Sequence, residues 1–296
     1  MLFTALCSLL FLPEVHHHKG GKVLPHEKYI HVVSEEVSPV ERVSIPGKDG
    51  KPIPAAIRKP QGKGPFPVLI HFHGAPGGRG IDRLVTWSRG DTGGPMWERF
   101  LKEGYVVVVA DYRAVDFSKL GQPIDPNVAS YVDDGVSVVE YVKKIPEVDP
   151  KRVTLYGVSL GGDVAITTAS RTSVKSVILG APAVLQFLGV RLNSIANNAS
   201  KMEFDTARAT KNITPIQCPI LIMVGTKDFL LNVDHVLHDQ LEKAGKAVRL
   251  EIFENGYHDF VMGPQGHENR DEPLMDITLA ALELALKFAK EPNRKP

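Results

Sequence analysis

Ser159 stands in the sequence Gly157-Val158-Ser159-Leu160-Gly161, between a short apolar run and an alanine- and threonine-rich segment. A strand before this pattern and a helix after it would place the serine at the apex of a sharp turn, with its hydroxyl exposed. Glycines on either side remove side chains that would clash in such a turn. The following helix would bring partial positive charge to an oxyanion. The pattern therefore predicts Ser159 as a nucleophile, with a structural turn as the alternative.

A serine hydroxyl needs a base to accept its proton and a third group to fix the tautomer of that base. Asp228 comes just after an apolar run at residues 220–224, and His258 comes after an alternating run at residues 248–253. When the serine lies between a strand and a helix, the expected chain order is Ser, Asp, His. We therefore predict His258 as the general base and Asp228 as the acid that orients it.

Three other residues compete for these roles. Asp234 falls within the next predicted helix and is expected to face away from the end of the strand. Asp259 adjoins His258 and is interpreted as a loop or surface carboxylate. His267 lies in a polar stretch beyond that loop. The sequence favours Asp228 and His258 over all three.

An oxyanion at the attacked carbonyl group needs two hydrogen-bond donors. The backbone N–H of Leu160, the residue after the nucleophile, is the first candidate. The second is expected in the glycine-rich loop after residues 66–72, where Gly74 lets the backbone approach the substrate. We predict the N–H of Ala75 as this second donor.

Two groups of histidines invite interpretation as metal sites. His71 and His73 share one side of an extended segment, but the sequence places no third ligand nearby. His16, His17 and His18 are adjacent and would point in different directions on a regular backbone, which favours a solvated linker. We therefore expect neither a metal nor an organic cofactor, and we interpret His73 as a brace for the glycine-rich loop.

The elements that would hold these residues alternate along the chain. Apolar or alternating runs predict strands at residues 66–72, 105–110, 153–156, 174–179, 220–224 and 248–253. Helical spacing and end signals predict helices at residues 95–103, 131–144, 162–170, 233–244 and 274–290. This order predicts an α/β fold with a doubly wound, mostly parallel sheet. Alternating residues around the turn signal Asp49-Gly50 add an N-terminal antiparallel hairpin at residues 40–60.

Composition restricts the class of protein and of partner. The chain has 296 residues, of which 43% are hydrophobic and 23% charged, as in an ordinary globular protein. Its 35 basic and 34 acidic residues give a net charge of +1, and no long basic run suggests nucleic-acid or membrane binding. We expect a small-molecule partner, and a homo-oligomer is left open.

Residues 1–12 are apolar but too short to span a bilayer, and they lack the positively charged start of a secretory signal. We interpret residues 1–25 as a partial export signal and linker, with an ordered strand or helix as the alternative. Export would make the protein periplasmic or secreted, and it would otherwise be cytoplasmic. Residues 26–296 are expected to form a single domain with a small lid insertion at about residues 185–217.

Several motifs resemble those of α/β-hydrolases near the catalytic domain of the prolyl oligopeptidases and the dienelactone hydrolases. They lie within roughly residues 40–290 and read HFHGAPGG, VVVVADYR, VDPKRVTLYGVSLGG, GTKD and GYHDF. The chain has no room for the β-propeller of the oligopeptidases, and it carries Ser159 where dienelactone hydrolases use cysteine. The resemblance implies a stand-alone serine esterase, similar to carboxylesterases and to feruloyl or acetyl-xylan esterases.

The resemblance implies hydrolysis of a carboxylic ester through an acyl-enzyme. Apolar surface for the acyl group is expected opposite the region of Trp87, from the lid residues Leu185, Phe187, Leu188 and Ile195. A peptidase acting on small peptides or aminoacyl amides is one alternative, and its charged anchor would come from Arg79, Arg83 or Arg89. A non-catalytic binding protein on the same fold is the other alternative.

Overall fold

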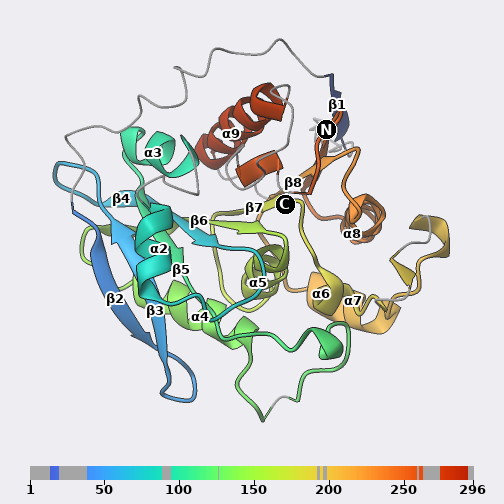
Figure 1. Cartoon of the computed structure of the whole chain (residues 1–296), viewed down its shortest axis with the longest axis horizontal. Helices are drawn as coiled ribbons and strands as arrows, with labels where there is room; N and C mark the ends of the chain where they lie inside the picture. Colours follow the sequence, from blue (N-terminus) through green and yellow to red (C-terminus); the bar gives the residue numbers. More distant parts are fainter. Residues whose placement is uncertain are drawn as a thin grey trace, which may run out of the picture.

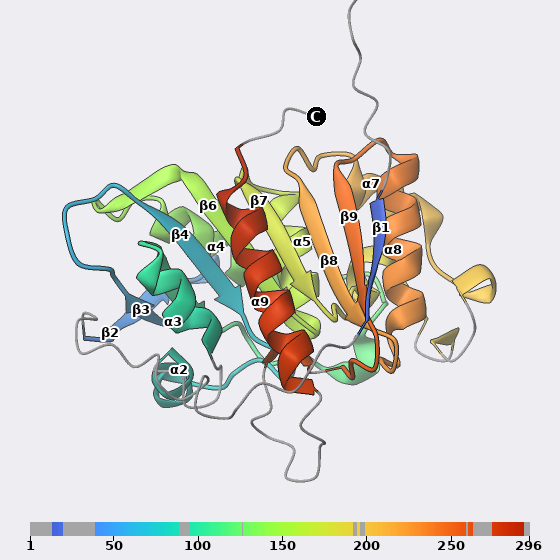
Figure 2. The same ribbon diagram turned by 90° about the horizontal axis from the view of Figure 1, so that it is seen from above.

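The computed structural model describes residues 14–19, 39–88, 95–125, 127–191, 194–195, 199–258, 260–262 and 274–292. Within these residues one nine-stranded sheet has the order β1-β9-β8-β7-β6-β4-β5-β3-β2 (Figures 1 and 2). The strands are β1 (Glu14–His18), β2 (Glu41–Pro46), β3 (Pro52–Arg58), β4 (Phe66–Phe72), β5 (Val106–Ala110), β6 (Val148–Val158), β7 (Ser176–Gly180), β8 (Ile220–Gly225) and β9 (Val248–Phe253). Only the pairs β2–β3 and β3–β5 are antiparallel.

Helices cover both faces of the sheet. One face carries α2 (Ile81–Ser88), α3 (Pro95–Lys102) and α9 (Leu274–Lys290). The opposite face carries α4 (Tyr131–Val142), α5 (Leu160–Ala169), α6 (Leu185–Leu188), α7 (Thr206–Ile213) and α8 (Leu231–Lys243). Figure 2 shows α9 and α3 in front of the strands, with α4 and α5 behind them. Short 3₁₀ turns lie at η1 (Phe117–Lys119), η3 (Ala199–Lys201) and η4 (Phe260–Met262).

The apolar strands supply both cores because successive side chains of a strand point to opposite faces. In β5, Val106 and Val108 join the core under α4 and α5, whereas Val107 and Val109 join the core under α3 and α9. All four valines are fully buried. A continuous apolar run is therefore what this position in a covered parallel sheet requires.

The structure confirms the predicted α/β fold, including the hairpin, in which β2 and β3 pair from Glu41 with Ile57 to Pro46 with Pro52. The glycine-rich stretch after β4 also forms α2, which the sequence pattern did not predict. Leu84 and Val85 of α2 are buried, so packing on the sheet holds this short helix. The predicted lid stretch lies between β7 and β8, and α6, η3 and α7 fall within it.

The histidine run differs from the expected solvated linker because it forms strand β1, parallel to β9. The imidazole of His18 stacks on Phe253 with ring centroids 4.5 Å apart, and its Nε2 lies 2.6 Å from the Glu251 carboxylate. These contacts with a distant part of the chain hold the run in the sheet. The predicted signal at residues 1–12 lies outside the described residues. None of the helices that the structure describes has the length and apolar content needed to cross a membrane.

Candidate active site

Ser159 occupies a strained turn between β6 and α5. Its backbone angles are φ 52° and ψ −124°, a conformation that L-residues rarely adopt. The Ser159 carbonyl accepts hydrogen bonds from the N–H groups of Gly162 and Ala183, both at 2.8 Å. A Cβ atom on Gly161 would lie 2.0 Å from the Phe72 carbonyl oxygen, so only glycine fits there. The surrounding backbone thus fixes the serine at the carboxyl end of β6.

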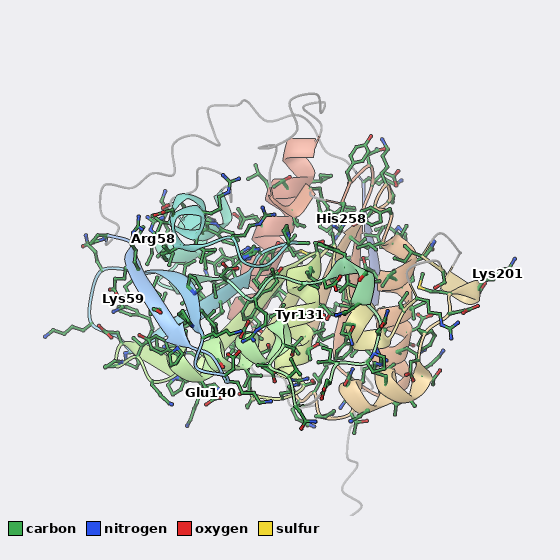
Figure 3. All side chains as sticks on the ribbon, turned by 60° about the horizontal axis from the view of Figure 1, so that its bottom comes forward. Arg58, Lys59, Tyr131, Glu140, Lys201 and His258 are labelled. Carbon is green, nitrogen blue, oxygen red and sulfur yellow. The ribbon has the colours of Figure 1, made fainter. Side chains whose placement is uncertain are left out.

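The structure brings Ser159, His258 and Asp228 together from three separate strand ends. Nε2 of His258 lies 2.9 Å from Oγ of Ser159. Nδ1 of His258 lies 3.0 Å and 3.1 Å from the two carboxylate oxygens of Asp228. The Asp228 side chain is fully buried, whereas His258 is 26% exposed. His258 is labelled in Figure 3.

These contacts determine the tautomer of His258. A carboxylate can only accept, so Nδ1–H of His258 donates to Asp228, and Nε2 is left to accept the Ser159 hydroxyl proton. Asp228 is itself held in place because its Oδ1 accepts from the Leu230 N–H at 2.8 Å. The arrangement can remove a proton from the serine and stabilise the imidazolium that forms.

Leu160 and the loop with Gly74 and Ala75, which were predicted to supply oxyanion donors, both lie next to Ser159. Leu160 begins α5, and the first N–H groups of a helix have no acceptor within their own helix. A Cβ atom on Gly74 would lie 3.4 Å from Cβ of Ser159, so the loop after β4 passes directly beside the serine. The carbonyl oxygen of Ala75 accepts a hydrogen bond from Arg79 Nη2 at 2.6 Å, which helps to fix the loop.

Asp111 organises this loop, a role that sequence reasoning missed although the residue lies in the quoted motif VVVVADYR. Its buried carboxylate accepts from the N–H groups of Gly78 and Gly80 at 2.9 Å and 2.8 Å. Nε2 of His73 lies 3.1 Å from the same carboxylate, and Nδ1 lies 2.7 Å from the Gly74 carbonyl oxygen. Burial raises the pKa of Asp111, but hydrogen bonds from His73 and Gly80 outweigh it, so the pKa falls below its ordinary value.

The model of the dienelactone hydrolase family matches residues 54–273. This chain belongs to the dienelactone hydrolase family. Among curated relatives, the quorum-quenching protein AidA of Acinetobacter baumannii is 29% identical over 126 residues, 42% of this chain and 38% of that protein. The uncharacterized protein YfhR of Escherichia coli strain K12 is 25% identical over 254 residues, 82% of this chain and 81% of that protein.

Solved structures share the fold of this dienelactone hydrolase family member. An esterase of Pyrobaculum calidifontis has a TM-score of 0.63, with 21% identity over 88% of both chains. The carboxylesterase EstE1 from a metagenomic library has a TM-score of 0.62, with 21% identity over 88% of this chain and 92% of that one. The acylaminoacyl peptidase of Pyrococcus horikoshii has a TM-score of 0.61, with 17% identity over 89% of this chain and 43% of that one. The fold is therefore that of the α/β-hydrolases, and the family identifies a hydrolase.

The residues predicted to contact the acyl group lie mostly in the core of this family member. Leu185, Phe187 and Leu188 of α6 are 4%, 1% and 0% exposed, and they belong to the core on the α5 side of the sheet. Ile195 packs against the same core. These apolar side chains are thus used for packing, and their contact with an acyl group stays a prediction. Trp87 lies in α2, but its side chain is outside the described part of the structure.

Asp163 couples α5 to two neighbouring helices. Its buried carboxylate accepts from the Phe187 N–H of α6 and from the Tyr131 hydroxyl of α4, both at 2.8 Å. Figure 3 labels Tyr131, which comes from the face opposite α9. Burial raises the pKa of Asp163 to about 7, although these two hydrogen bonds lower it. Sequence reasoning did not single out this residue, because an aspartate in the first turn of a helix is common.

Two of the three arginines considered as a peptide anchor lie in the described structure. Arg79 donates to the Ala75 carbonyl oxygen in the loop after β4, and the exposed Arg83 lies on α2. Arg89 lies outside the described residues, as do the rival residues Asp259 and His267.

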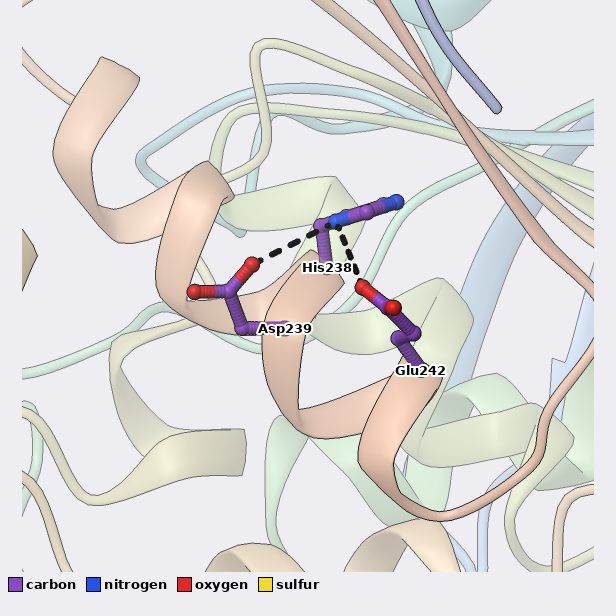
Figure 4. Close-up of side chains that lie close together, drawn as sticks. All are labelled: His238, Asp239 and Glu242. Carbon is purple, nitrogen blue, oxygen red and sulfur yellow. Dashed lines mark ion pairs between the residues drawn. The ribbon is translucent and has the colours of Figure 1, made fainter. Parts of the chain in front are cut away.

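One histidine and two carboxylate groups lie together on α8, away from His71 and His73, which we considered from the sequence as metal ligands and did not favour. Nδ1 of His238 lies 3.5 Å from Asp239 Oδ1 and 3.9 Å from Glu242 Oε2 (Figure 4). Across the residues that the structure describes, these three are the set with metal-ligand atoms all within 4.8 Å of one another. Both carboxylates are exposed, and Glu242 has the i,i+4 spacing from His238 that is typical of pairs along a helix. Burial lowers the pKa of His71 well below its ordinary value, and that imidazole packs against Trp97.

Asp234 is fully buried in α8, contrary to the expectation that it faces away from the end of the strand. Neither carboxylate oxygen has a hydrogen-bond partner among the described residues. Burial raises the pKa of Asp234 well above its ordinary value, and the negative charge of Asp228 raises it further. Both causes favour the protonated form of the Asp234 carboxyl group.

The Asp234→Asn variant is expected to be more stable than the wild type, with a gain that grows as pH rises above about 4. Folding raises the pKa of Asp234, so the folded chain retains a proton that the unfolded chain releases, and stability falls with rising pH. For one group the slope reaches about 1.4 kcal/mol per pH unit. Urea unfolding of both proteins at pH 5 and pH 8 measures this difference.

The matched control is Asp239→Asn, which removes an exposed carboxylate from the same helix. Water hydrates that carboxylate in both the folded and unfolded states, so its removal should change the pH dependence of stability much less. A stability difference for Asp234→Asn that stays constant between pH 5 and pH 8 would contradict the burial of an uncharged acid.

Proposed function

We propose that this hydrolase cleaves carboxylic esters, with Ser159 as nucleophile, His258 as general base and Asp228 as the orienting acid. The supporting observation is the pair of contacts of His258, which lies 2.9 Å from Ser159 Oγ and 3.0 Å from Asp228. Base and nucleophile are within the distance needed for direct proton transfer. A binding protein that merely kept the fold would have no need of this arrangement.

In the proposed reaction, Oγ of Ser159 attacks the ester carbonyl carbon while Nε2 of His258 takes the hydroxyl proton. The tetrahedral oxyanion is stabilised by the N–H groups of Leu160 and Ala75. Its collapse breaks the bond to the alcohol oxygen, which receives the proton from His258 and leaves as the alcohol. A water molecule, deprotonated by His258, then attacks the acyl-enzyme, and the acid is released with the Ser159 hydroxyl restored. These steps need no metal or organic cofactor.

The position of the N–H groups beside Ser159 supports an acyl-transfer site in particular. The Leu160 N–H lies at the start of α5, where the helix dipole favours negative charge, and the loop at Gly74 runs beside Ser159 Cβ. Asp111 and His73 hold that loop through backbone contacts, so the donors are positioned before substrate binds. Donors fixed in this way need no reorganisation during the reaction.

The test compares p-nitrophenyl esters from acetate to decanoate with aminoacyl p-nitroanilides, together with a feruloyl ester and acetylated xylan. We expect kcat/KM for the esters to far exceed that for the anilides, and the ester series to define the acyl length. Labelling with a fluorophosphonate, followed by peptide mass spectrometry, should place the adduct on Ser159. Dominant anilide turnover would favour the peptidase alternative, and absence of both turnover and labelling would favour a binding protein.

A further inference from the structure

Two aromatic side chains next to the triad are exposed. Phe229 follows Asp228 and is 64% exposed, whereas Tyr257 precedes His258 and is 38% exposed. In the described part of the chain, no other large hydrophobic side chain has an exposed fraction as high as that of Phe229. Exposed apolar rings at the mouth of a polar site are typical of ligand-binding surfaces.

The loops that carry these rings are fixed against each other by their backbones. The N–H of Lys227 donates to the Gly256 carbonyl oxygen at 2.9 Å. A Cβ atom on Gly225 would lie 2.1 Å from that same oxygen, so the two loops touch without intervening side chains. The Lys227 ammonium group also lies 5.0 Å from the centre of the Tyr257 ring. The loop after β8, which carries Phe229, and the loop after β9, which carries Tyr257, are therefore held together next to the proposed triad.

Phe229 also contacts the catalytic histidine proposed above. The centres of the Phe229 and His258 rings are 4.7 Å apart, and the ring planes are inclined by 46°. In the proposed reaction His258 gives its proton to the leaving alcohol oxygen. The part of the substrate nearest to Phe229 is then the alcohol portion, not the acyl group.

We propose that Phe229 and Tyr257 form the subsite for the alcohol portion and select esters of aromatic alcohols. The inference rests on the proposed function. An aromatic ring that stacks against Phe229, or meets it edge to face, gains attraction beyond the area that it buries. An aliphatic ring of similar size buries comparable area without that attraction. The exposed ring would thus be covered when substrate binds.

The experiment compares benzyl acetate with cyclohexylmethyl acetate, which share an acyl group and differ in the aromatic character of the alcohol. We expect the wild type to favour benzyl acetate in kcat/KM, by about three- to tenfold. Phe229→Ala and Phe229→Leu should both remove this preference, because neither side chain has a ring. Methyl acetate, whose alcohol portion is too small to reach the ring, should lose less activity than benzyl acetate in either variant.

Val15→Ala provides the matched control, because Val15 is an exposed apolar residue on the edge strand β1. This variant should retain the wild-type preference. Equal losses for methyl and benzyl acetate in Phe229→Ala would overturn the proposal, since Phe229 would then only position His258. A change of preference along the acyl series, with none in the alcohol series, would overturn it as well.

A binding measurement separates failure of this inference from failure of the proposed function. Calorimetry with Ser159→Ala, which removes the proposed nucleophile, should show tighter binding of benzyl acetate than of cyclohexylmethyl acetate. The double variant Ser159→Ala/Phe229→Ala should lose that difference. If the wild type hydrolyses no ester, the proposed function fails, and this binding difference still decides whether the aromatic subsite exists. Equal binding of the two esters by Ser159→Ala would overturn the subsite.

Discussion

Replacing Ser159 by alanine is expected to lower kcat for ester hydrolysis by about 10⁶-fold, because no other group can form the acyl-enzyme. The fold should persist. The hydrogen bonds that hold residue 159 use its backbone N–H and carbonyl groups, and alanine at φ 52° is no more strained than serine. Steady-state rates on p-nitrophenyl acetate, with thermal unfolding measured alongside, test both statements.

Ser159→Cys serves as the companion variant, since it keeps a nucleophilic atom at the same turn. It should retain ester turnover above that of Ser159→Ala and should become sensitive to thiol-alkylating reagents. If Ser159→Ala kept most of the wild-type rate at an unchanged melting temperature, the nucleophile would have to be sought elsewhere.

Asp228→Asn is expected to lower kcat by about 10⁴-fold while leaving the fold intact. The asparagine amide can donate to Nδ1 of His258, which places the imidazole proton on Nε2 and prevents that atom from accepting the serine proton. The rate loss should fall in kcat more than in KM, because substrate does not contact the buried residue 228. Full pH–rate profiles for wild type and variant provide the measurement.

The buried Asp234 offers the sharpest control for that prediction. Burial is the main cause of the raised pKa of Asp234, and the charge of Asp228 adds to it. Asp228→Asn removes the second cause, which makes ionisation of Asp234 easier, so Asp234 could ionise and partly replace the lost acid. If it does so, the double variant Asp228→Asn/Asp234→Asn will be slower than Asp228→Asn alone. Equal rates would show that Asp234 has no access to His258. Near wild-type activity in Asp228→Asn would refute the assignment of residue 228.

Local patterns were sufficient to predict strands β2 to β9 and to single out the three residues of the proposed triad. A buried parallel strand needs apolar side chains on both faces, so a strand such as β5 can be predicted from its apolar sequence alone. Ser159, Asp228 and His258 each follow such a strand, and the carboxyl ends of parallel strands share one edge of the sheet. Their proximity therefore follows from order along the chain.

The remaining features depend on contacts between residues that are far apart in the sequence, and local patterns do not reveal such contacts. The polar run at His18 forms a strand because Glu251 and Phe253, from the other end of the chain, receive it. Asp234 is buried because of how α8 is rotated about its own axis. The pattern of the adjacent apolar residues Val233 and Leu237 did not predict this rotation closely enough. Leu185 is buried in the core. A leucine suits a core position and a substrate-facing position equally well, so the residue type alone does not distinguish them.

Strand β1 has a consequence for maturation of the chain. It covers β9 and forms the edge of the sheet in its place, as a short strand of mostly polar residues. A short polar edge is less prone to pair with another molecule than a longer edge strand such as β9 would be. Proteolytic removal of a leader ahead of Glu14 would preserve this cover. A cut between His18 and β2 would instead leave β1 as a detached peptide, and its dissociation would expose β9 to intermolecular strand addition. The position of any processing site would thus decide whether the mature molecules remain separate in solution or associate through β9.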